Sequence, residues 1–283
     1  MTTPIRVGLI GAGIGKSRTP RLHMAEAAAQ GFRLRYDLID VETQTNPSLE
    51  RLIAEAEAQG FAGLNITHPF KQAVLPLLNE LSEDASALGA VNTVVFGERG
   101  RVGHNTDWSG FLEGFRQTLP DVPLATVLQL GAGGAGAAVA YAAQAMNVER
   151  LLLSDMDIGR AEALAARMNA SAGRAYVHVA SDLSTAMEAA DGLINTTPMG
   201  MAAHPGLPLP ADLLTSRHWV ADVVYFPLVT PLLALARERG CRSVDGSGMA
   251  VFQAVGAFRL FTGKEADPLR MRETFQAATP VTA

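Results

Sequence analysis

Short apolar segments alternate with longer segments of helical periodicity through the first part of the chain. The predicted strands are residues 5–10, 32–39 and 63–66, and the predicted helices are residues 20–30, 48–59 and, less clearly, 71–78. Thr19 before Pro20 is typical of a helix N-cap, Gly60 is typical of a helix end, and Pro76 disfavours the third helix. This β-α-β order predicts an α/β domain with a parallel or mostly parallel sheet.

A second alternation of the same kind begins near Thr126. Its predicted strands are residues 127–130, 151–154, 176–179, 192–194 and 219–224, and its predicted helices are residues 137–146, 160–168, 249–261 and 269–277. We place one domain boundary at residues 107–108 and the other near Val244. We therefore expect two domains: one formed by residues 1–107 and completed by 244–283, and a second formed by residues 108–243.

A glycine-rich turn follows the predicted strand 127–130 and has the sequence Gly131-Ala-Gly133-Gly134-Ala135-Gly136. This G-x-G-x-x-G spacing between a strand and a helix is typical of a Rossmann-like dinucleotide-binding domain. Its helix N-terminus would bind the pyrophosphate, and Asp155, 19 residues after Gly136, would bind the adenosine ribose. The turn therefore predicts NAD(P) or FAD binding, although an Ala/Gly-rich turn can also serve only tight helix–sheet packing.

The other glycine-rich turn, residues 11–15, breaks that spacing and leads into the hydroxyl side chains of Ser17 and Thr19. Such a segment suits a small polar molecule better than a pyrophosphate. We therefore expect the first domain to bind the substrate and the second to bind the cofactor.

Composition narrows the classes of partner. The 283 residues are 48% hydrophobic and 18% charged, with a net charge of −5, a pI near 5.7 and a mean hydropathy of +0.15. Lys and Arg form no run, which argues against nucleic acid, and no stretch approaches the roughly 20 apolar residues of a membrane span. The first residues lack the layout of a signal peptide. Cys241 is the single cysteine, so we expect no internal disulfide, no cysteine metal cluster and a cytoplasmic location.

Polar clusters interrupt the apolar pattern of the first domain at residues 65–71, 92–93 and 104–107. Sites in open α/β sheets gather at the carboxyl ends of strands, and amides and hydroxyls there would suit a polyol carboxylate. Lys71 and Asp107 fit alcohol oxidation, in which a hydroxyl loses a proton as a hydride leaves. Taken singly, Lys71 is more typical of a surface cation near a helix start, and Asp107 is as typical of a helix N-cap as of a catalytic residue. His68 and His104 lack partners at ligand spacing, so we expect no metal.

An ordered series of motifs extends from residue 17 to residue 263. It comprises Ser17-Arg-Thr19-Pro20-x-x-His23, Gly63-Leu-Asn65-Ile-Thr67-His-Pro-Phe-Lys71, Gly89-Ala-Val-Asn92-Thr, Gly103-His-Asn105-Thr-Asp107, Gly131–Gly136, Asn195-Thr-Thr-Pro198-Met-Gly200-Met201, Asp222-Val-Val-Tyr225-Phe-Pro227, Gly246-Ser-Gly-Met249-x-x-x-Gln253-Ala and Phe261-Thr-Gly263. In this series the chain resembles the shikimate dehydrogenase family.

The resemblance implies a role for each matching position. Ser17 and Thr19 would bind the substrate carboxylate, and Lys71 and Asp107 would be the catalytic acid/base pair. The ring and hydroxyl pocket would be lined by Asn65, Thr67, Asn92, Tyr225 and Gln253. The cofactor would be bound by Gly131, Gly133, Gly134, Ala135, Gly136, Asp155 and Arg160, with Pro198, Met201, Gly246 and Met249 bordering the nicotinamide.

Two departures from the family pattern bear on the cofactor and the substrate. Members that use NADP usually carry an Asn-Arg-Thr-like run where this chain has Ser154-Asp155-Met156-Asp157, and Thr19 replaces the usual second Ser. Both departures resemble the NAD-dependent quinate/shikimate branch.

The resemblance thus implies NAD-dependent interconversion of a ring hydroxyl of shikimate or quinate with the ketone of 3-dehydroshikimate or 3-dehydroquinate. An aminoshikimate dehydrogenase and a catalytically silent module that binds NAD or a polyol remain alternatives, and the intact Lys71/Asp107 pair argues against the silent module. The sequence leaves monomer and homodimer open.

Overall fold

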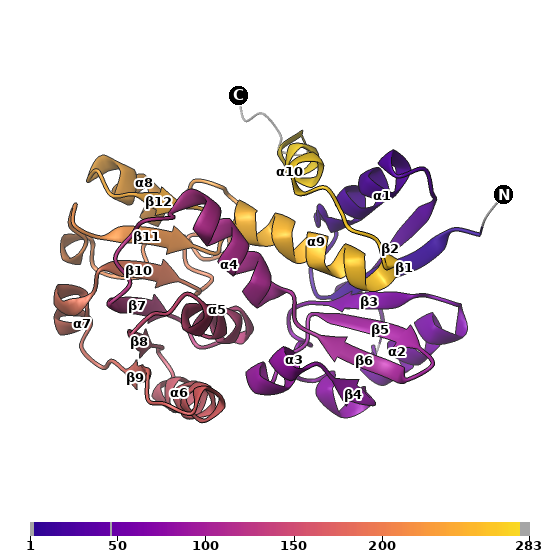
Figure 1. The fold of residues 1–283 in the computed structure, drawn as a ribbon, viewed down its shortest axis with the longest axis horizontal. Coiled ribbons are helices and arrows are strands. Elements are labelled where there is room, and N and C mark those ends of the chain that lie inside the picture. The colour runs from indigo at the N-terminus through magenta and orange to yellow at the C-terminus, as the bar shows by residue number, and fades with distance from the viewer. Residues whose placement is uncertain (1–2, 46, 278–283) are drawn as a thin grey trace. The chain divides into compact units, whose positions relative to one another are not determined.

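The computed structural model describes residues 3–45 and 47–277, which divide into two compact units (Figure 1). Unit 1 comprises Met1–Thr106 with Val251–Ala283, and unit 2 comprises Asp107–Ala250. The chain returns to unit 1 seven residues later than the predicted boundary at Val244. The reason is strand β12 (Ser243–Val244), which pairs with β11 (Trp219–Asp222) and so belongs to the sheet of unit 2.

Unit 1 is built on a sheet with the strand order β2-β1-β3-β5-β6-β4. The strands are β1 (Ile5–Gly11), β2 (Leu34–Asp40), β3 (Gly63–Ile66), β4 (Glu80–Leu81), β5 (Thr93–Gly97) and β6 (Gly100–His104). The helices are α1 (Thr19–Ala29), α2 (Leu49–Ala58), α3 (Glu83–Leu88), α9 (Ser247–Thr262) and α10 (Pro268–Ala277), with short 3-10 turns η1 (Val41–Thr43) and η2 (Leu75–Leu77). Strand β1 runs parallel to β2 and β3, whereas β5 runs antiparallel to β3 and β6.

The two faces of this sheet are covered by different helices. Helix α2 packs through Leu52 and Ile53 against Leu64 on one face. On the other face α9 lies so close that a Cβ added at Gly63 would come within 2.7 Å of the Phe261 ring. Side chains alternate along a strand, so Asn65 shares the α9 face with Gly63.

Two local predictions in unit 1 are wrong. Thr19 is the first residue of α1 and not its N-cap. The N-cap is Arg18, whose side chain makes no capping hydrogen bond. Residues 71–78 form turns and η2 instead of an α-helix, because Pro76 lacks a backbone donor and restricts the residue before it.

Unit 2 has the strand order β12-β11-β10-β7-β8-β9, and every pairing in it is parallel. Its remaining strands are β7 (Thr126–Leu130), β8 (Arg150–Ser154), β9 (Val177–Val179) and β10 (Gly192–Asn195). Its helices are α4 (Asp107–Thr118), α5 (Gly134–Ala145), α6 (Ile158–Ala172), α7 (Leu183–Ala189) and α8 (Pro231–Glu238), with a 3-10 turn η3 (Ala211–Leu213). Helices α5 and α6 cover one face, and α7 and α8 cover the other (Figure 1).

Counted from β7, this strand order is the doubly wound 3-2-1-4-5-6 order of dinucleotide-binding domains. The order reverses between β7 and β10, which pair in parallel, and ligands of such sheets bind beyond the carboxyl ends of the strands at that point. The predicted α/β fold class with a Rossmann-like domain is confirmed. Within the described residues, no helix has the length and hydrophobicity needed to cross a bilayer.

Candidate active site

A buried chain of hydrogen bonds crosses the sheet of unit 1 and fixes two of the predicted substrate residues. The Tyr36 hydroxyl donates to Asn65 Oδ1 at 2.7 Å, and Asn65 Nδ2 donates to Thr93 Oγ1 at 3.0 Å. The Thr93 hydroxyl donates to Asn92 Oδ1 at 3.0 Å, and Asn92 Nδ2 donates to Thr106 Oγ1 at 2.9 Å. All five side chains are buried, so the network holds both amides in one orientation.

The orientation of the Asn65 amide follows from a backbone contact. Asn65 Nδ2 also donates to the carbonyl of Asn92 at 3.3 Å, and a carbonyl can only accept a hydrogen bond. Both hydrogens of the amide are therefore used inside the protein. Toward a ligand, Asn65 can present only its carbonyl oxygen, which makes it an acceptor for a substrate hydroxyl.

Thr67 and Lys71 lie in the loop that follows β3, and backbone hydrogen bonds anchor both ends of this loop. The Thr67 N–H donates to the Ile10 carbonyl at 3.0 Å, and the Lys71 carbonyl accepts from the Val91 N–H at 2.8 Å. A Cβ at Gly11 would come within 2.3 Å of the Thr67 side chain, so only glycine permits this approach to β1. The half-buried Lys71 is thereby held at the carboxyl edge of the sheet.

The loop that carries Ser17 and Thr19 is held by the end of β2. The Asp40 carboxylate accepts from the N–H groups of Gly13 and Ile14 at 3.0 and 2.9 Å. The Ser17 N–H then donates to the Ile14 carbonyl at 2.9 Å, and both Ser17 and Thr19 are half-buried. The structure therefore places these two hydroxyl residues together at the start of α1, whose first residue is Thr19.

His23 belongs to the same motif but lies in the core of unit 1. Its ring is fully buried among Tyr36, Phe258 and Phe261, with ring centroids 5.1, 5.9 and 6.0 Å away. Neither ring nitrogen has a hydrogen-bond partner among the residues that the structure describes. Burial lowers the pKa of His23 to about 3, so the ring is neutral near pH 7. His23 is a packing residue of this core.

The remaining predicted site residues fall in two places. Gln253 lies half-buried on α9, in unit 1. Asp107 begins α4 in unit 2 and is buried, and Tyr225 lies in the loop after β11 with 44% of its surface exposed. Within the described residues, no group of three or more His, Cys, Asp or Glu side chains could hold a metal ion.

The glycine-rich turn of unit 2 requires glycine at two of its predicted positions. Gly131 has a φ of +100°, a left-handed conformation that other residues rarely adopt. A Cβ at Gly136 would lie 2.3 Å from the Gly131 carbonyl oxygen, so the start of α5 could not pack against the end of β7. These are the turn and packing roles that glycines have in a pyrophosphate-binding turn.

Two buried side chains that sequence reasoning missed hold the carbonyls of this turn. Gln129 Nε2 donates to the carbonyls of Gly131 and Gly136 at 2.9 and 2.8 Å. The Thr196 hydroxyl lies within hydrogen-bond distance of the carbonyls of Leu130 and Gly131, at 2.7 and 2.9 Å. The first N–H groups of α5 have no preceding helical carbonyl to bond, which suits them to an anionic group.

Asp155 is fixed beside the same turn by backbone donors. Its Oδ2 accepts from the Ala132 N–H at 2.7 Å, and its Oδ1 accepts from the Asp157 N–H at 2.9 Å. Because Asp155 follows β8, its carboxylate lies where a dinucleotide fold binds the adenosine ribose. Arg160 forms an ion pair with Asp157 at 3.8 Å, and both side chains of that pair are more than half exposed.

A buried carboxylate also organises the loops after β10 and β11. Asp222 accepts from Asn195 Nδ2 at 3.0 Å, from the Thr230 hydroxyl at 2.7 Å and from the Val224 N–H at 3.0 Å. Burial raises the pKa of Asp222, although these hydrogen bonds oppose the rise. The loops held in this way carry Pro198, Met201 and Tyr225. The sequence motifs included Asp222 and Asn195, but gave neither a role.

The comparisons with known proteins agree with this geometry. Residues 9–94 match the model of the shikimate dehydrogenase substrate binding domain, and residues 246–274 match that of the shikimate 5'-dehydrogenase C-terminal domain. A quinate/shikimate dehydrogenase (NAD(+)) of Corynebacterium efficiens is 54% identical over 276 residues, covering 96% of this chain and 97% of that protein. A shikimate dehydrogenase (NADP(+)) of Streptomyces avermitilis is 52% identical over 269 residues, covering 94% and 92%.

Solved structures show the same fold. The quinate dehydrogenase of Corynebacterium glutamicum in complex with NAD matches with a TM-score of 0.92 and 51% identity, covering 97% of this chain and 99% of that one. The shikimate 5-dehydrogenase of Thermus thermophilus in complex with NADP(H) and shikimate matches with a TM-score of 0.86 and 33% identity, covering 97% and 100%.

Proposed function

Because the chain belongs to the shikimate dehydrogenase family, we propose that it oxidises a ring hydroxyl of quinate and shikimate with NAD. The position of Asp155 is the observation that favours NAD over NADP. Backbone donors hold its carboxylate beside the glycine-rich turn. There the carboxylate would accept hydrogen bonds from both ribose hydroxyls. A 2'-phosphate would bring like charges within a few ångströms, which is unfavourable in a poorly hydrated site.

The residues of unit 2 fit this cofactor. The close approach of Gly136 to Gly131 sets the start of α5 against the end of β7, where a pyrophosphate would bind, and Gly133, Gly134 and Ala135 would supply the adjoining backbone. Pro198, Met201, Gly246 and Met249 would border the nicotinamide, and Arg160 would lie at the ribose end. When bound, NAD supplies the acceptor for the hydride that leaves the substrate carbon.

The residues of the first domain would bind and orient the substrate. We assign the carboxylate to Ser17 and Thr19, and one ring hydroxyl to the acceptor oxygen of Asn65. Thr67, Asn92 and Gln253 would line the ring, and Tyr225, which belongs to unit 2, would also bind the substrate.

Lys71 and Asp107 would remove the proton from the hydroxyl that is oxidised, and would return it when the ketone is reduced. Removal of that proton lets the oxygen form a carbonyl as the hydride leaves. The single cysteine supports a cytoplasmic location for this enzyme.

A panel of substrates tests the proposal. Quinate, shikimate and aminoshikimate are mixed in parallel with NAD and the purified protein, and the absorbance of the reduced nicotinamide is followed. We expect turnover of both quinate and shikimate, with a higher kcat/KM for each than for aminoshikimate. No NAD reduction with any of the three would indicate a silent binding module, and a preference for aminoshikimate would indicate an aminoshikimate dehydrogenase on the same scaffold.

A substitution at Thr19 tests which side chain sets the balance between quinate and shikimate. Quinate carries an additional hydroxyl on the carbon that bears the carboxylate, so that hydroxyl must fit beside Ser17 and Thr19. Thr19→Ser removes a methyl group and should change the ratio of kcat/KM for the two substrates. An unchanged ratio would exclude Thr19 as the determinant.

A further inference from the structure

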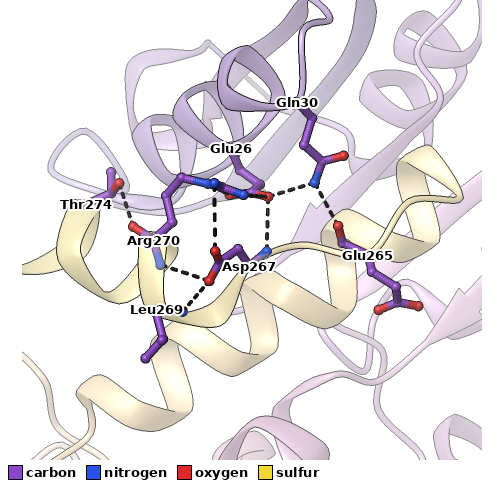
Figure 2. A network of polar contacts seen from close by, with 7 residues as sticks. All are labelled: Glu26, Gln30, Glu265, Asp267, Leu269, Arg270 and Thr274. Carbon is purple, nitrogen blue, oxygen red and sulfur yellow. Dashed lines mark hydrogen bonds and ion pairs between the residues drawn. The ribbon is translucent and has the colours of Figure 1, made fainter.

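The C-terminal helix α10 is joined to α1 by a buried carboxylate, that of Glu26 (Figure 2). Arg270 donates to both oxygens of this carboxylate, through Nε at 2.7 Å and Nη2 at 3.0 Å. The Asp267 N–H and Gln30 Nε2 donate to Oε1 at 3.0 and 2.7 Å. Gln30 also donates to the Glu265 carbonyl at 2.7 Å, so the end of α1 and the start of α10 are held together.

The contact between Arg270 and Glu26 is strong because the accepting carboxylate is charged and buried. The Glu26 side chain has no exposed surface, whereas Arg270 is 40% exposed. Burial alone would raise the pKa of Glu26, but the hydrogen bonds from Arg270, Asp267 and Gln30 outweigh it and lower the pKa. Glu26 is therefore ionised near pH 7 and depends on the cation that α10 supplies.

The other end of α1 is also joined to α10, at the residue between the two proposed carboxylate ligands. The Arg18 guanidinium lies over the Phe275 ring, with Cζ 4.8 Å from the ring centroid, and Nη1 donates to the Phe275 carbonyl at 3.4 Å. Arg18 stands between Ser17 and Thr19 in the sequence. The Arg18 side chain thus connects the segment 17–19, which carries both hydroxyls, to α10.

We propose that α10 is a positioning element for the substrate carboxylate, and that Arg18 and Arg270 are the positioning residues through which it acts. Asp40 holds the loop from the side of β2, and Arg18 holds it from the side of α10. Arg270 keeps α10 in register along α1 by binding Glu26. This proposal rests on the proposed function, because it requires that Ser17 and Thr19 bind a carboxylate.

The experiment compares a charged ligand with an uncharged one of the same shape. Shikimate is assayed as the substrate, and its carboxamide is assayed as a competitive inhibitor, in the wild type and in Arg18→Met and Arg270→Met. We expect each variant to raise the KM for shikimate by about 3- to 10-fold, because a small misplacement of binding groups weakens a directional contact. The Ki of the carboxamide, the kcat and the KM for NAD should each change by less than about twofold.

Controls separate this role from general stability. Arg259, on α9, forms an exposed ion pair with Glu265, which lies after the helix. Arg259→Met removes this pair and should leave the two KM values, the Ki and the kcat unchanged. Arg18→Lys keeps a cation and should recover part of the loss at that position. Melting temperatures identify any variant that has lost structure; should Arg270→Met fail to fold, the Arg18 variants carry the test.

The outcomes distinguish the inference from its premise. Suppose that Ser17→Ala weakens the binding of shikimate but not that of the carboxamide, while the Arg18 and Arg270 variants weaken the binding of neither. Then α10 does not position the carboxylate site. The same holds if the arginine variants weaken both ligands equally. If Ser17→Ala itself fails to distinguish the two ligands, the carboxylate assignment of the proposed function is at fault.

Discussion

Replacing His23 by phenylalanine should reduce the sensitivity of unit 1 to mild acid. The neutral ring of His23 is enclosed by Tyr36, Phe258 and Phe261, and burial lowers its pKa from 6.5 to about 3. In the unfolded chain the ring regains its ordinary pKa and binds a proton below about pH 6.5. The unfolded state then holds more protons than the folded state, so stability falls as the pH falls from about 6.5 toward 3.

The size of the effect follows from the depression of this pKa. Each pKa unit is worth about 1.4 kcal/mol, so the full difference reaches about 5 kcal/mol near pH 3. Between pH 6.5 and pH 5 the stability lost through His23 amounts to about 2 kcal/mol, which is a large share of the free energy of unfolding of an ordinary domain. Phenylalanine keeps the aromatic packing, has nothing to protonate and leaves no unpaired ring nitrogen in the core.

Urea unfolding of both proteins between pH 7 and pH 5 measures this difference. The free energy of unfolding of His23→Phe relative to wild type should rise by about 2 kcal/mol as the pH falls across this range. Phe258→Leu is the matched control, because it weakens the same cluster without an ionisable group and should give an offset independent of pH. A difference between His23→Phe and wild type that stays constant with pH would refute the reasoning.

Two further substitutions test the cofactor site. Asp155→Ser should narrow the preference for NAD over NADP, measured as the ratio of kcat/KM, because it removes a negative charge from the ribose position; an unchanged ratio would remove Asp155 from cofactor choice. Gln129→Met keeps the volume of the side chain but removes the hydrogen bonds that Gln129 donates to the carbonyls of Gly131 and Gly136, and should raise the KM for NAD by about tenfold. An unchanged KM for NAD would show that the turn keeps its shape without Gln129.

The parts of the fold that depend on local pattern were predictable. The strands of unit 2 are mostly apolar runs, and the glycine spacing of residues 131–136 specifies both the turn and the start of α5. The antiparallel β5–β6 hairpin was not predicted, because Glu98 and Arg99 give no strong turn signal next to Gly97 and Gly100.

The contacts that hold the site depend on strand order and register, which no local pattern reveals. Tyr36 lies in the predicted strand 32–39, but no local pattern in that strand predicts a partner for its hydroxyl. Strands β2 and β3 both flank β1, and this order places the Tyr36 hydroxyl on Asn65. Gln129 interrupts an apolar strand, which is a signal that could have drawn attention to the turn it supports. The role of α10 depends on its packing along α1, and its sequence carries no motif for that.

The rate of NAD reduction by wild type, Lys71→Ala, Asp107→Ala and the double variant tests the central claim most directly. With saturating shikimate or quinate, each single variant should lower kcat by roughly 10²- to 10⁴-fold while NAD binding, followed by fluorescence, is retained. If the two residues act as one unit, the double variant should be little slower than the slower single variant. A Lys71→Ala enzyme with near-normal kcat would contradict the account.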